Sequence, residues 1–358
     1  MNYRKSIGSV KPYVPGKTED EIKRQYNLES VVKIASNENP YGPTPKVREY
    51  LKNLDINIYP DNYVTKLRER LSAFYDINEE MLLFGNGSVE IIQMLSRILL
   101  DEGDNIVTEL PSFSSYFSEA MIQGAEIRTI KYNDAYSFNL EDMLELIDEK
   151  TKMIYLTNPN NPLGSAISYK EIKSFISKVP KDILIVVDEA YMEFVRDENV
   201  KTCINDVKDN KNVCILRTFS KAYGLAALRI GYIVADIEVI QNLEKVRVPF
   251  NSSTIAQNSA IIALEDQEYM AEKVRLNHDV IDFMYNELEK IGLEYIKTQA
   301  NFICINVNKD CNEISQRLLE KGYIVRGGFP LLDKWIRVSI GTMNQMKGFV
   351  ATLKEVIE

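Results

Sequence analysis

The sequence predicts an α/β protein, in which a large domain built on a parallel sheet is followed by a smaller α+β domain. Short β-branched or aromatic runs recur along the first two thirds of the chain, and each ends in glycine or polar residues. These runs are continuously apolar, as expected for strands that helices cover on both faces of a parallel sheet. After about residue 240, longer amphipathic helices and shorter strands replace this pattern.

The strands of the large domain are each expected from one such run. Residues 81–100, MLLFGNGSVEIIQMLSRILL, predict a strand, a glycine turn and a helix, and residues 105–124 repeat this order. Three more strand-to-loop junctions are expected at 153–164 (MIYLTNPNNPLG), 183–194 (ILIVVDEAYMEF) and 213–224 (VCILRTFSKAYG). Ligands bind outside the carboxyl ends of strands in open α/β sheets, so the polar residues that follow these runs should gather in one site.

Three regions are expected along the chain. Residues 1–30 form an extended arm that packs on other parts of the protein, residues 31–240 form the large domain, and residues 241–358 form the small domain. The elements expected in the small domain are helices within 246–292 and strands at 301–307 (NFICINV), 323–328 (YIVRGG) and 335–341 (WIRVSIG).

The composition disfavours several classes of protein. The chain has 358 residues and a net charge of -9 without a block of basic residues, which disfavours binding to DNA or RNA. No apolar run reaches the roughly 20 residues that span a bilayer, and the N-terminus lacks the apolar stretch of a signal peptide, so we expect a cytoplasmic protein without a membrane partner. The four cysteines form no C-x-x-C pair and there is one histidine, so we expect neither a metal site nor a Ser-His-Asp triad.

Lys221 lies in TFSKAYGLAALRIGY, residues 218–232, which is mostly small, apolar and aromatic. Desolvation disfavours a charged ammonium there, so we expect either a nucleophilic amine bound to a carbonyl cofactor or an ion pair with a carboxylate. Asp188 ends the apolar run ILIVVD, and a buried carboxylate there needs a cation or a hydrogen-bond donor. Pyridoxal phosphate uses both groups, the amine for covalent attachment and the carboxylate to keep its pyridine nitrogen protonated.

A phosphate site is expected where GNGSVE, residues 85–90, opens a helix, because the free amides and the helix dipole attract anions there. Ser220 could add a hydroxyl, and Arg229 a charge-assisted hydrogen bond. In isolation, GNGS is equally consistent with a plain turn. The sequence has no G-x-x-x-x-G-K-[ST] pattern to support a nucleotide site.

Seven motifs occur in an order typical of one known family: ASNENPYGP, YPD, GNGSVEII, NPNNPLG, DEAYMEF, TFSKAYGLAALRIGY and WIRVSIGT. With the arm VKPYVPGK they cover nearly the whole chain. The sequence therefore resembles the fold type I, class II aminotransferases and, among them, the histidinol-phosphate aminotransferase family. This resemblance implies a mostly parallel seven-stranded sheet sandwiched by helices and a pyridoxal 5'-phosphate cofactor. It also implies a homodimer with shared active sites, in which the N-terminal arm packs on the partner subunit.

The resemblance also implies roles for individual residues. Lys221 would bind the cofactor covalently and later move a proton, and Asp188 would pair with the ring nitrogen. The other implied cofactor contacts are Tyr191 and Asn161 at the ring oxygen, Gly87, Ser88, Ser220 and Arg229 at the phosphate, Phe113 on the ring face with Tyr116 as the alternative, and Tyr59 at the phosphate of the neighbouring subunit.

Arg337 lies within the apolar run WIRVSIG, where a guanidinium suits bidentate contact with a carboxylate or phosphate. The resemblance likewise assigns it to the anionic end of the substrate. Arg326 would be the second cation, although a solvated arginine beside a glycine turn is the alternative. Tyr13 and Asn37 would line the substrate pocket.

The implied reaction is transamination between histidinol phosphate and 2-oxoglutarate, giving imidazole acetol phosphate and glutamate. Two other activities stay open, an aromatic amino acid aminotransferase and a decarboxylase of a phospho-amino acid such as threonine phosphate. A cofactor-sensing transcription regulator would need a helix-turn-helix module ahead of residue 30, which the sequence lacks. Val89, Leu163 and Ala227 depart from residues common in the family and border the cofactor loops, so the sequence predicts the cofactor more firmly than the substrate.

Overall fold

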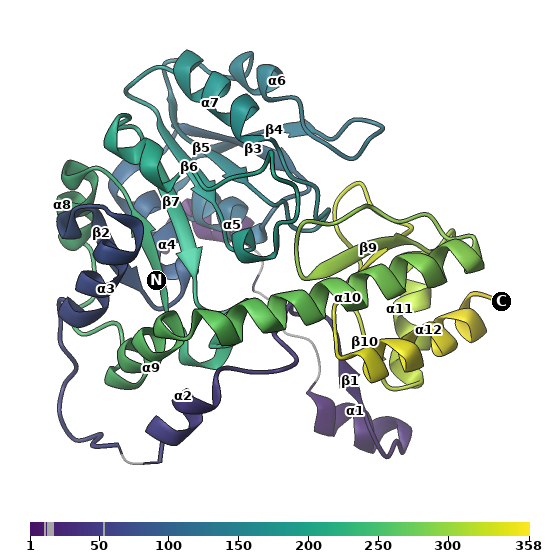
Figure 1. The fold of residues 1–358 in the computed structure, drawn as a ribbon. Helices are drawn as coiled ribbons and strands as arrows, with labels where there is room; N and C mark the ends of the chain where they lie inside the picture. Colours follow the sequence, from purple (N-terminus) through teal and green to yellow (C-terminus); the bar gives the residue numbers. More distant parts are fainter. Residues whose placement is uncertain (11, 13–17, 53) are drawn as a thin grey trace.

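A computed structural model describes residues 1–10, 12, 18–52 and 54–358. Among these residues, the largest sheet has seven strands in the order β2-β8-β7-β6-β5-β3-β4 (Figure 1). Strand β8 runs antiparallel to both neighbours, and the other pairs are parallel. The predicted mostly parallel sheet is confirmed. Its strands are β2 (Leu82–Gly85), β3 (Asn105–Leu110), β4 (Glu126–Lys131), β5 (Thr151–Thr157), β6 (Leu184–Asp188), β7 (Val213–Thr218) and β8 (Gly231–Val234).

Helices cover both faces of this sheet, as the continuous apolar runs predicted. In β6, Ile185 and Val187 belong to one core cluster, whereas Leu184 and Val186 belong to another on the opposite face. The first cluster also contains side chains of α3 (Thr65–Tyr75), α6 (Leu140–Leu144), α7 (Tyr169–Lys178) and α9 (Thr254–Glu265). The second contains side chains of α4 (Ser88–Leu99), α5 (Ser114–Gln123) and α8 (Ile237–Glu244).

A second apolar core lies beside the large sheet. Strands β9 (Phe302–Asn306) and β11 (Trp335–Ser339) pair antiparallel, and β1 (Val32–Lys33) pairs in parallel with β10 (Tyr323–Ile324). Their buried side chains pack with those of α10 (Gln267–Ile291), α11 (Cys311–Glu320) and α12 (Met343–Ile357). The long helix α10 runs from α9 at the large sheet to this second core (Figure 1).

The N-terminal segments pack on both parts. The 3-10 helix η1 (Lys5–Ser9) contacts α5, and α1 (Glu19–Tyr26) contacts α11. Helix α1 begins with a capping box, in which the Thr18 hydroxyl accepts a hydrogen bond from the amide of Glu21, and the Glu21 carboxylate accepts one from the amide of Thr18. The exact domain boundaries, after residues 30 and 240, stay a prediction.

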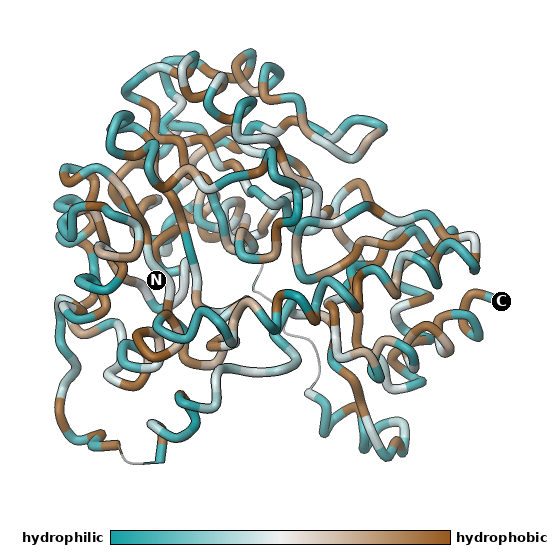
Figure 2. Tube along the Cα trace, in the orientation of Figure 1, coloured by the Kyte–Doolittle hydropathy of each residue, from teal (hydrophilic) through white to brown (hydrophobic). Residues whose placement is uncertain are grey.

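Apolar residues concentrate in the strands of the sheets, and polar residues in the outer loops and helix faces (Figure 2). The loop between α2 (Pro45–Tyr50) and α3 departs from this pattern, since Ile56, Ile58 and Tyr59 are each more than two-thirds exposed. Within the described ranges, no helix is both long and apolar enough to cross a membrane.

A buried ion-pair network ties the ends of β6 and β7 together. Arg217 on β7 donates to the carboxylate of Glu189 at 2.9 Å and to that of Glu193 at 2.8 Å, and all three side chains are at least nine-tenths buried. Glu189 also accepts hydrogen bonds from the Thr202 hydroxyl (2.6 Å) and the Cys203 amide (2.7 Å). The network therefore fixes the two strand ends that carry Asp188 and lead to Lys221.

Replacing Arg217 with methionine should lower the free energy of unfolding by about 3–5 kcal/mol, because the change leaves two carboxylates buried without their cation. Urea unfolding of both variants measures this. Arg275→Met is the matched control, since Arg275 forms an exposed pair with Asp279 on α10 and such pairs contribute little. Equal losses in the two variants would contradict the role given to this network.

Candidate active site

Lys221 lies in the loop that follows β7, at the carboxyl edge of the large sheet. Its half-buried Nζ donates a hydrogen bond to the carbonyl oxygen of Ser36 at 3.0 Å and lies 5.8 Å from the ring centroid of Tyr191. Burial, which is the largest cause, and the positive charge of Arg337 together lower the pKa of Lys221 to about 8. The neutral, nucleophilic amine is therefore far more populated near neutral pH than in an ordinary lysine.

Asp188 is the last residue of β6, beside β7, and is 4% exposed. Its Oδ2 accepts a hydrogen bond from the Tyr116 hydroxyl at 2.6 Å, and its Oδ1 accepts one from the amide of Ala190 at 3.1 Å. Burial raises the pKa of Asp188, while these two hydrogen bonds and the charge of Lys221 oppose the rise. This is a buried carboxylate that a further cation or donor would stabilise.

The start of α4 meets an arginine. Gly87 is the N-cap of α4, with φ at +77°, and a Cβ on it would come within 2.4 Å of Arg229 Nη2. Arg229 Nη1 also donates to the Ser220 hydroxyl at 3.3 Å. The predicted phosphate residues Gly87, Ser88, Ser220 and Arg229 are thus brought together. Glycine suits the positive φ at position 87, and a Cβ there would displace the guanidinium from its place beside the first amides of the helix.

A polar network lies at the ring end of the site. The Tyr191 hydroxyl accepts hydrogen bonds from Asn37 Nδ2 at 3.0 Å and from Asn161 Nδ2 at 3.4 Å. Asn161 Oδ1 in turn accepts from Arg337 Nη1 at 2.5 Å. The Asn37 amide group is fixed from the other side, because Ser339 donates its hydroxyl hydrogen to Asn37 Oδ1 at 2.8 Å. Four residues predicted separately from sequence therefore share one network.

The two arginines predicted to bind the substrate lie directly opposite each other. Arg326 and Arg337 pair across an antiparallel bridge, with backbone hydrogen bonds of 3.2 and 2.7 Å. Arg337 is buried, and its guanidinium carbon lies 5.3 Å from the ring centroid of Phe302 and 5.2 Å from that of Phe329. Arg326 is exposed. Directly paired residues project to the same face of a sheet, which leaves a buried and an exposed cation side by side.

The two aromatic residues predicted as candidates for stacking on the cofactor, Phe113 and Tyr116, differ in their burial and packing. Tyr116 is fully buried and stacks on Tyr155, with ring centroids 4.1 Å apart and planes 11° apart. Phe113 is half-buried at the start of α5, and its ring meets the edge of Tyr116 at 5.6 Å. Because Tyr116 already has one face on Tyr155 and its hydroxyl on Asp188, Phe113 is the better candidate for stacking on a cofactor ring.

Two predicted residues are not brought into this group. Tyr59 is 79% exposed and stacks on the exposed ring of Phe250 at 4.8 Å. Tyr13 lies outside the described residues. A role for Tyr59 in the active site therefore requires a second subunit, as the resemblance implied.

Sequence reasoning missed three contributors: the Ser36 carbonyl that receives the Lys221 amine, the hydrogen bond of Tyr116 to Asp188, and the buried Glu109. Glu109 Oε1 accepts a hydrogen bond from the amide of Thr157 at 2.9 Å. An acid inside the strand-like run NIVTEL was the available signal for Glu109.

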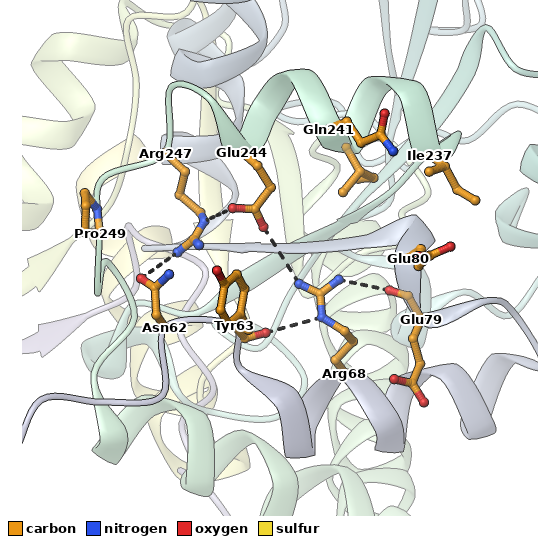
Figure 3. Close-up of a pocket in the computed structure, with 11 residues that line it drawn as sticks. Asn62, Tyr63, Arg68, Glu79, Glu80, Ile237, Gln241, Glu244, Arg247 and Pro249 are labelled. Carbon is orange, nitrogen blue, oxygen red and sulfur yellow. Dashed lines mark hydrogen bonds and ion pairs between the residues drawn. The ribbon is translucent and has the colours of Figure 1, made fainter.

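A cavity of about 580 Å³ lies elsewhere, between α3, α8 and the loop after α8 (Figure 3). Arg68 and Arg247 both form ion pairs with Glu244 across it. Its lining includes neither Lys221 nor Asp188, so it is separate from the site described above. In the part of the chain that the structure describes, no group of three or more His, Cys, Asp or Glu residues is arranged to hold a metal ion.

Known proteins with similar sequences and structures include aminotransferases. The histidinol-phosphate aminotransferase of Halalkalibacterium halodurans is 42% identical over 360 residues, covering 100% of this chain and 97% of that protein. The structure of histidinol-phosphate aminotransferase from Sinorhizobium meliloti in complex with pyridoxal-5'-phosphate matches with a TM-score of 0.90 at 28% identity, covering 99% of this chain and 97% of that one.

Aspartate aminotransferase from Thermus thermophilus with maleate matches with a TM-score of 0.85 at 19% identity, covering 99% of this chain and 100% of that one, a likeness of fold alone. The predicted fold type I architecture is thereby confirmed. The sequence model of the family described as aminotransferase class I and II matches residues 29–353. With that match over most of its length, the chain belongs to the class I and II aminotransferases.

Proposed function

We propose that the protein transfers the amino group of L-histidinol phosphate to 2-oxoglutarate, with pyridoxal 5'-phosphate as cofactor. The products are imidazole acetol phosphate and glutamate, and the reaction is a step of histidine biosynthesis. The observation that carries this proposal is the full-length 42% identity to a relative named histidinol-phosphate aminotransferase. The chemistry of the site, considered next, agrees with it.

The residues of the site fit pyridoxal phosphate. Bound at the site, the cofactor supplies an aldehyde that accepts the amino group and a ring that withdraws electrons from the reacting carbon. Its phosphate would be held by the first amides of α4 with Ser220 and Arg229, where Gly87 leaves the space. Asp188, buried with two donors, would hold the ring nitrogen in its protonated form. The remaining contacts are Asn161 and Tyr191 at the ring oxygen and Phe113 on the ring face.

Lys221 has two tasks in the proposed reaction. Its neutral amine is the nucleophile for attachment of the cofactor, which its pKa of about 8 favours. When it is not attached to the cofactor, the same amine would take the proton from the substrate carbon that carries nitrogen. The Ser36 carbonyl, which accepts its hydrogen bond at 3.0 Å, gives the free amine a resting position.

The substrate anion would bind at the paired arginines. One pocket must accept the phosphate of one substrate and the carboxylates of the other, and a guanidinium binds both groups bidentately. Arg337 lies between two aromatic rings and donates to Asn161, so it joins the substrate site to the residues at the cofactor ring. Arg326 would add the second cation, and Asn37 would line the pocket, as the resemblance also implies for Tyr13.

A homodimer with shared active sites is part of the proposal. Exposed apolar side chains gather on two segments that the stacking of Tyr59 on Phe250 joins. They are Leu51, Ile56, Ile58, Tyr59, Tyr63, Val248 and Phe250. An exposed apolar surface of this kind is typical of an interface, and a second subunit there would receive Tyr59 at its cofactor phosphate. The net charge of -9 disfavours nucleic acid as a partner, and we expect the enzyme in the cytoplasm, without a membrane partner.

The half-reaction tests the proposed function. Cofactor-loaded protein is mixed with histidinol phosphate without an oxo acid, and the absorbance band of bound pyridoxal phosphate is followed. The band should disappear as pyridoxamine phosphate forms, and 2-oxoglutarate should restore it. Phenylalanine is the matched amino donor, because it tests the aromatic aminotransferase alternative.

A parallel run with threonine phosphate measures carbon dioxide. A stable band with histidinol phosphate together with gas release from threonine phosphate would contradict the proposal and favour the decarboxylase. Faster loss of the band with phenylalanine than with histidinol phosphate would favour the aromatic aminotransferase.

The pKa of Lys221 predicts how its reactivity depends on pH. In the cofactor-free protein, trace labelling with acetic anhydride should modify the Lys221 peptide with a midpoint near pH 8, against about 10.4 for an ordinary lysine, because the neutral amine reacts. Arg337→Met should raise this midpoint by removing a nearby cation, and Asp188→Asn should lower it by removing an anion. Mass spectrometry of the digested protein measures the label. A labelling midpoint near pH 10 for the Lys221 peptide of the protein without substitutions would contradict this description of the site.

A further inference from the structure

Tyr116 is held rigidly beside Asp188. Its ring lies flat on Tyr155, with centroids 4.1 Å apart, and the ring of Phe113 packs against its edge. Its hydroxyl donates to Asp188 Oδ2 at 2.6 Å, the shorter of the two hydrogen bonds that the carboxylate accepts. Because the stacked rings determine where the hydroxyl lies, they also determine where the carboxylate lies.

The hydrogen bond between Tyr116 and Asp188 belongs to a longer series of hydroxyl contacts. Thr157 Oγ1 donates to the Tyr116 oxygen at 3.4 Å and lies 2.9 Å from Ser112 Oγ. Ser112 Oγ also lies 3.3 Å from Glu109 Oε2, and because Thr157 uses its one proton on Tyr116, the single Ser112 proton points either to Thr157 or to Glu109. Thr157 pairs with Asp188 in the register of β5 and β6, so the strands themselves align Thr157 with the carboxylate that Tyr116 binds. Glu109, Thr157 and Asp188 lie on β3, β5 and β6, Tyr116 lies in the first turn of α5, and Ser112 lies in the loop between β3 and α5.

The directions of the two hydrogen bonds at the Tyr116 oxygen follow from the single proton of its hydroxyl. An ionised Asp188 can only accept, so the single hydroxyl proton of Tyr116 points to it. The Tyr116 oxygen is then free to accept from Thr157. Burial and the charge of Asp188 both raise the pKa of Tyr116, which therefore stays a protonated donor at physiological pH.

We propose that Tyr116 is a positioning residue for the cofactor, whose hydroxyl fixes the carboxylate of Asp188 and keeps it ionised to face the ring nitrogen. Thr157, Ser112 and Glu109 hold that hydroxyl in place. The inference rests on the proposed function for its cofactor, and it does not depend on which amine the enzyme accepts.

The test compares two tyrosines of one stack. Tyr116→Phe removes the hydroxyl on Asp188, whereas Tyr155→Phe removes a buried hydroxyl that lies 3.9 Å from Met153 Sδ and leaves Asp188 untouched. Both proteins are loaded with pyridoxal phosphate labelled with ¹⁵N in the ring. The ¹⁵N chemical shift reports the protonation of the ring nitrogen, and equilibrium dialysis gives the dissociation constant of the cofactor.

Tyr116→Phe should move the ¹⁵N signal toward that of the unprotonated ring, because Asp188 loses a donor and is more readily neutralised. It should also raise the dissociation constant roughly tenfold to a hundredfold, the effect of one hydrogen bond to a charged acceptor. Tyr155→Phe should change neither. Urea unfolding should show a larger loss of stability in Tyr116→Phe, whose hydroxyl binds a buried carboxylate, than in Tyr155→Phe. The ¹⁵N signal separates positioning from a merely structural role, because a loss of stability alone would not change the protonation of the ring nitrogen.

Thr157→Val keeps the inference testable if Tyr116→Phe does not fold. It removes the hydroxyl that contacts Tyr116, Ser112 and Glu109 but leaves the Tyr116 hydroxyl on Asp188, so it should shift the ¹⁵N signal in the same direction by less. Identical ¹⁵N signals and affinities in Tyr116→Phe and Tyr155→Phe would overturn the inference, as would an unshifted signal in Thr157→Val. If the protein without substitutions binds the cofactor but does not react with histidinol phosphate, only the proposed substrate is overturned. A protein that binds no pyridoxal phosphate would overturn both.

Discussion

The burial of charged groups at the carboxyl edge of the large sheet is the constraint on which the rest of the structure depends. A charge removed from water must find a partner of opposite sign or several hydrogen bonds. The buried charge of Arg217 has such partners within the protein, the carboxylates of Glu189 and Glu193. Asp188 and Lys221 are satisfied only in part by the protein itself, through hydrogen bonds to neutral groups. The incomplete partnership of these two groups marks the place where a cofactor with a cationic ring and an aldehyde can bind.

The second core supplies the arginines that we propose bind the substrate. Arg337 comes from β11, yet its guanidinium donates to Asn161, which follows β5 of the large sheet, and to the carbonyl of Ala35 at 2.6 Å. The same group lies between the rings of Phe302 and Phe329. A cation with so many neighbours is fixed before any substrate arrives, so little conformational freedom remains to be lost on binding. Substrate recognition and cofactor binding thereby share one network.

Much of this arrangement was predictable from sequence because it depends on local pattern. Continuous apolar runs predicted the buried strands, and the abrupt change to polar residues predicted where Asp188 and Lys221 would lie. Arg337 was predictable because a guanidinium within an apolar run needs an anionic or polar partner. The resemblance to a known family added roles for Asn37, Asn161 and Tyr191, which the pattern alone did not supply.

Other features were not predictable, because they depend on contacts between distant segments. The hydroxyl of Ser339 reaches Asn37 across 302 positions of the chain, and no local pattern encodes that distance. Tyr116 could be read only as an aromatic residue near the site, since its hydrogen bond to Asp188 depends on the stacking against Tyr155. The proposed role of Tyr59 in another active site depends on a second subunit, which lies outside the contacts of one chain.

The central claim is that Lys221 is the attachment point of the cofactor, because it combines an amine of lowered pKa with a neighbouring carboxylate and anion site. Reduction of the cofactor-loaded protein with borohydride, followed by digestion and mass spectrometry, tests this most directly. The account predicts a pyridoxyl group on the peptide that contains Lys221 and on no other peptide. A pyridoxyl group on another lysine, with the Lys221 peptide unmodified, would contradict it.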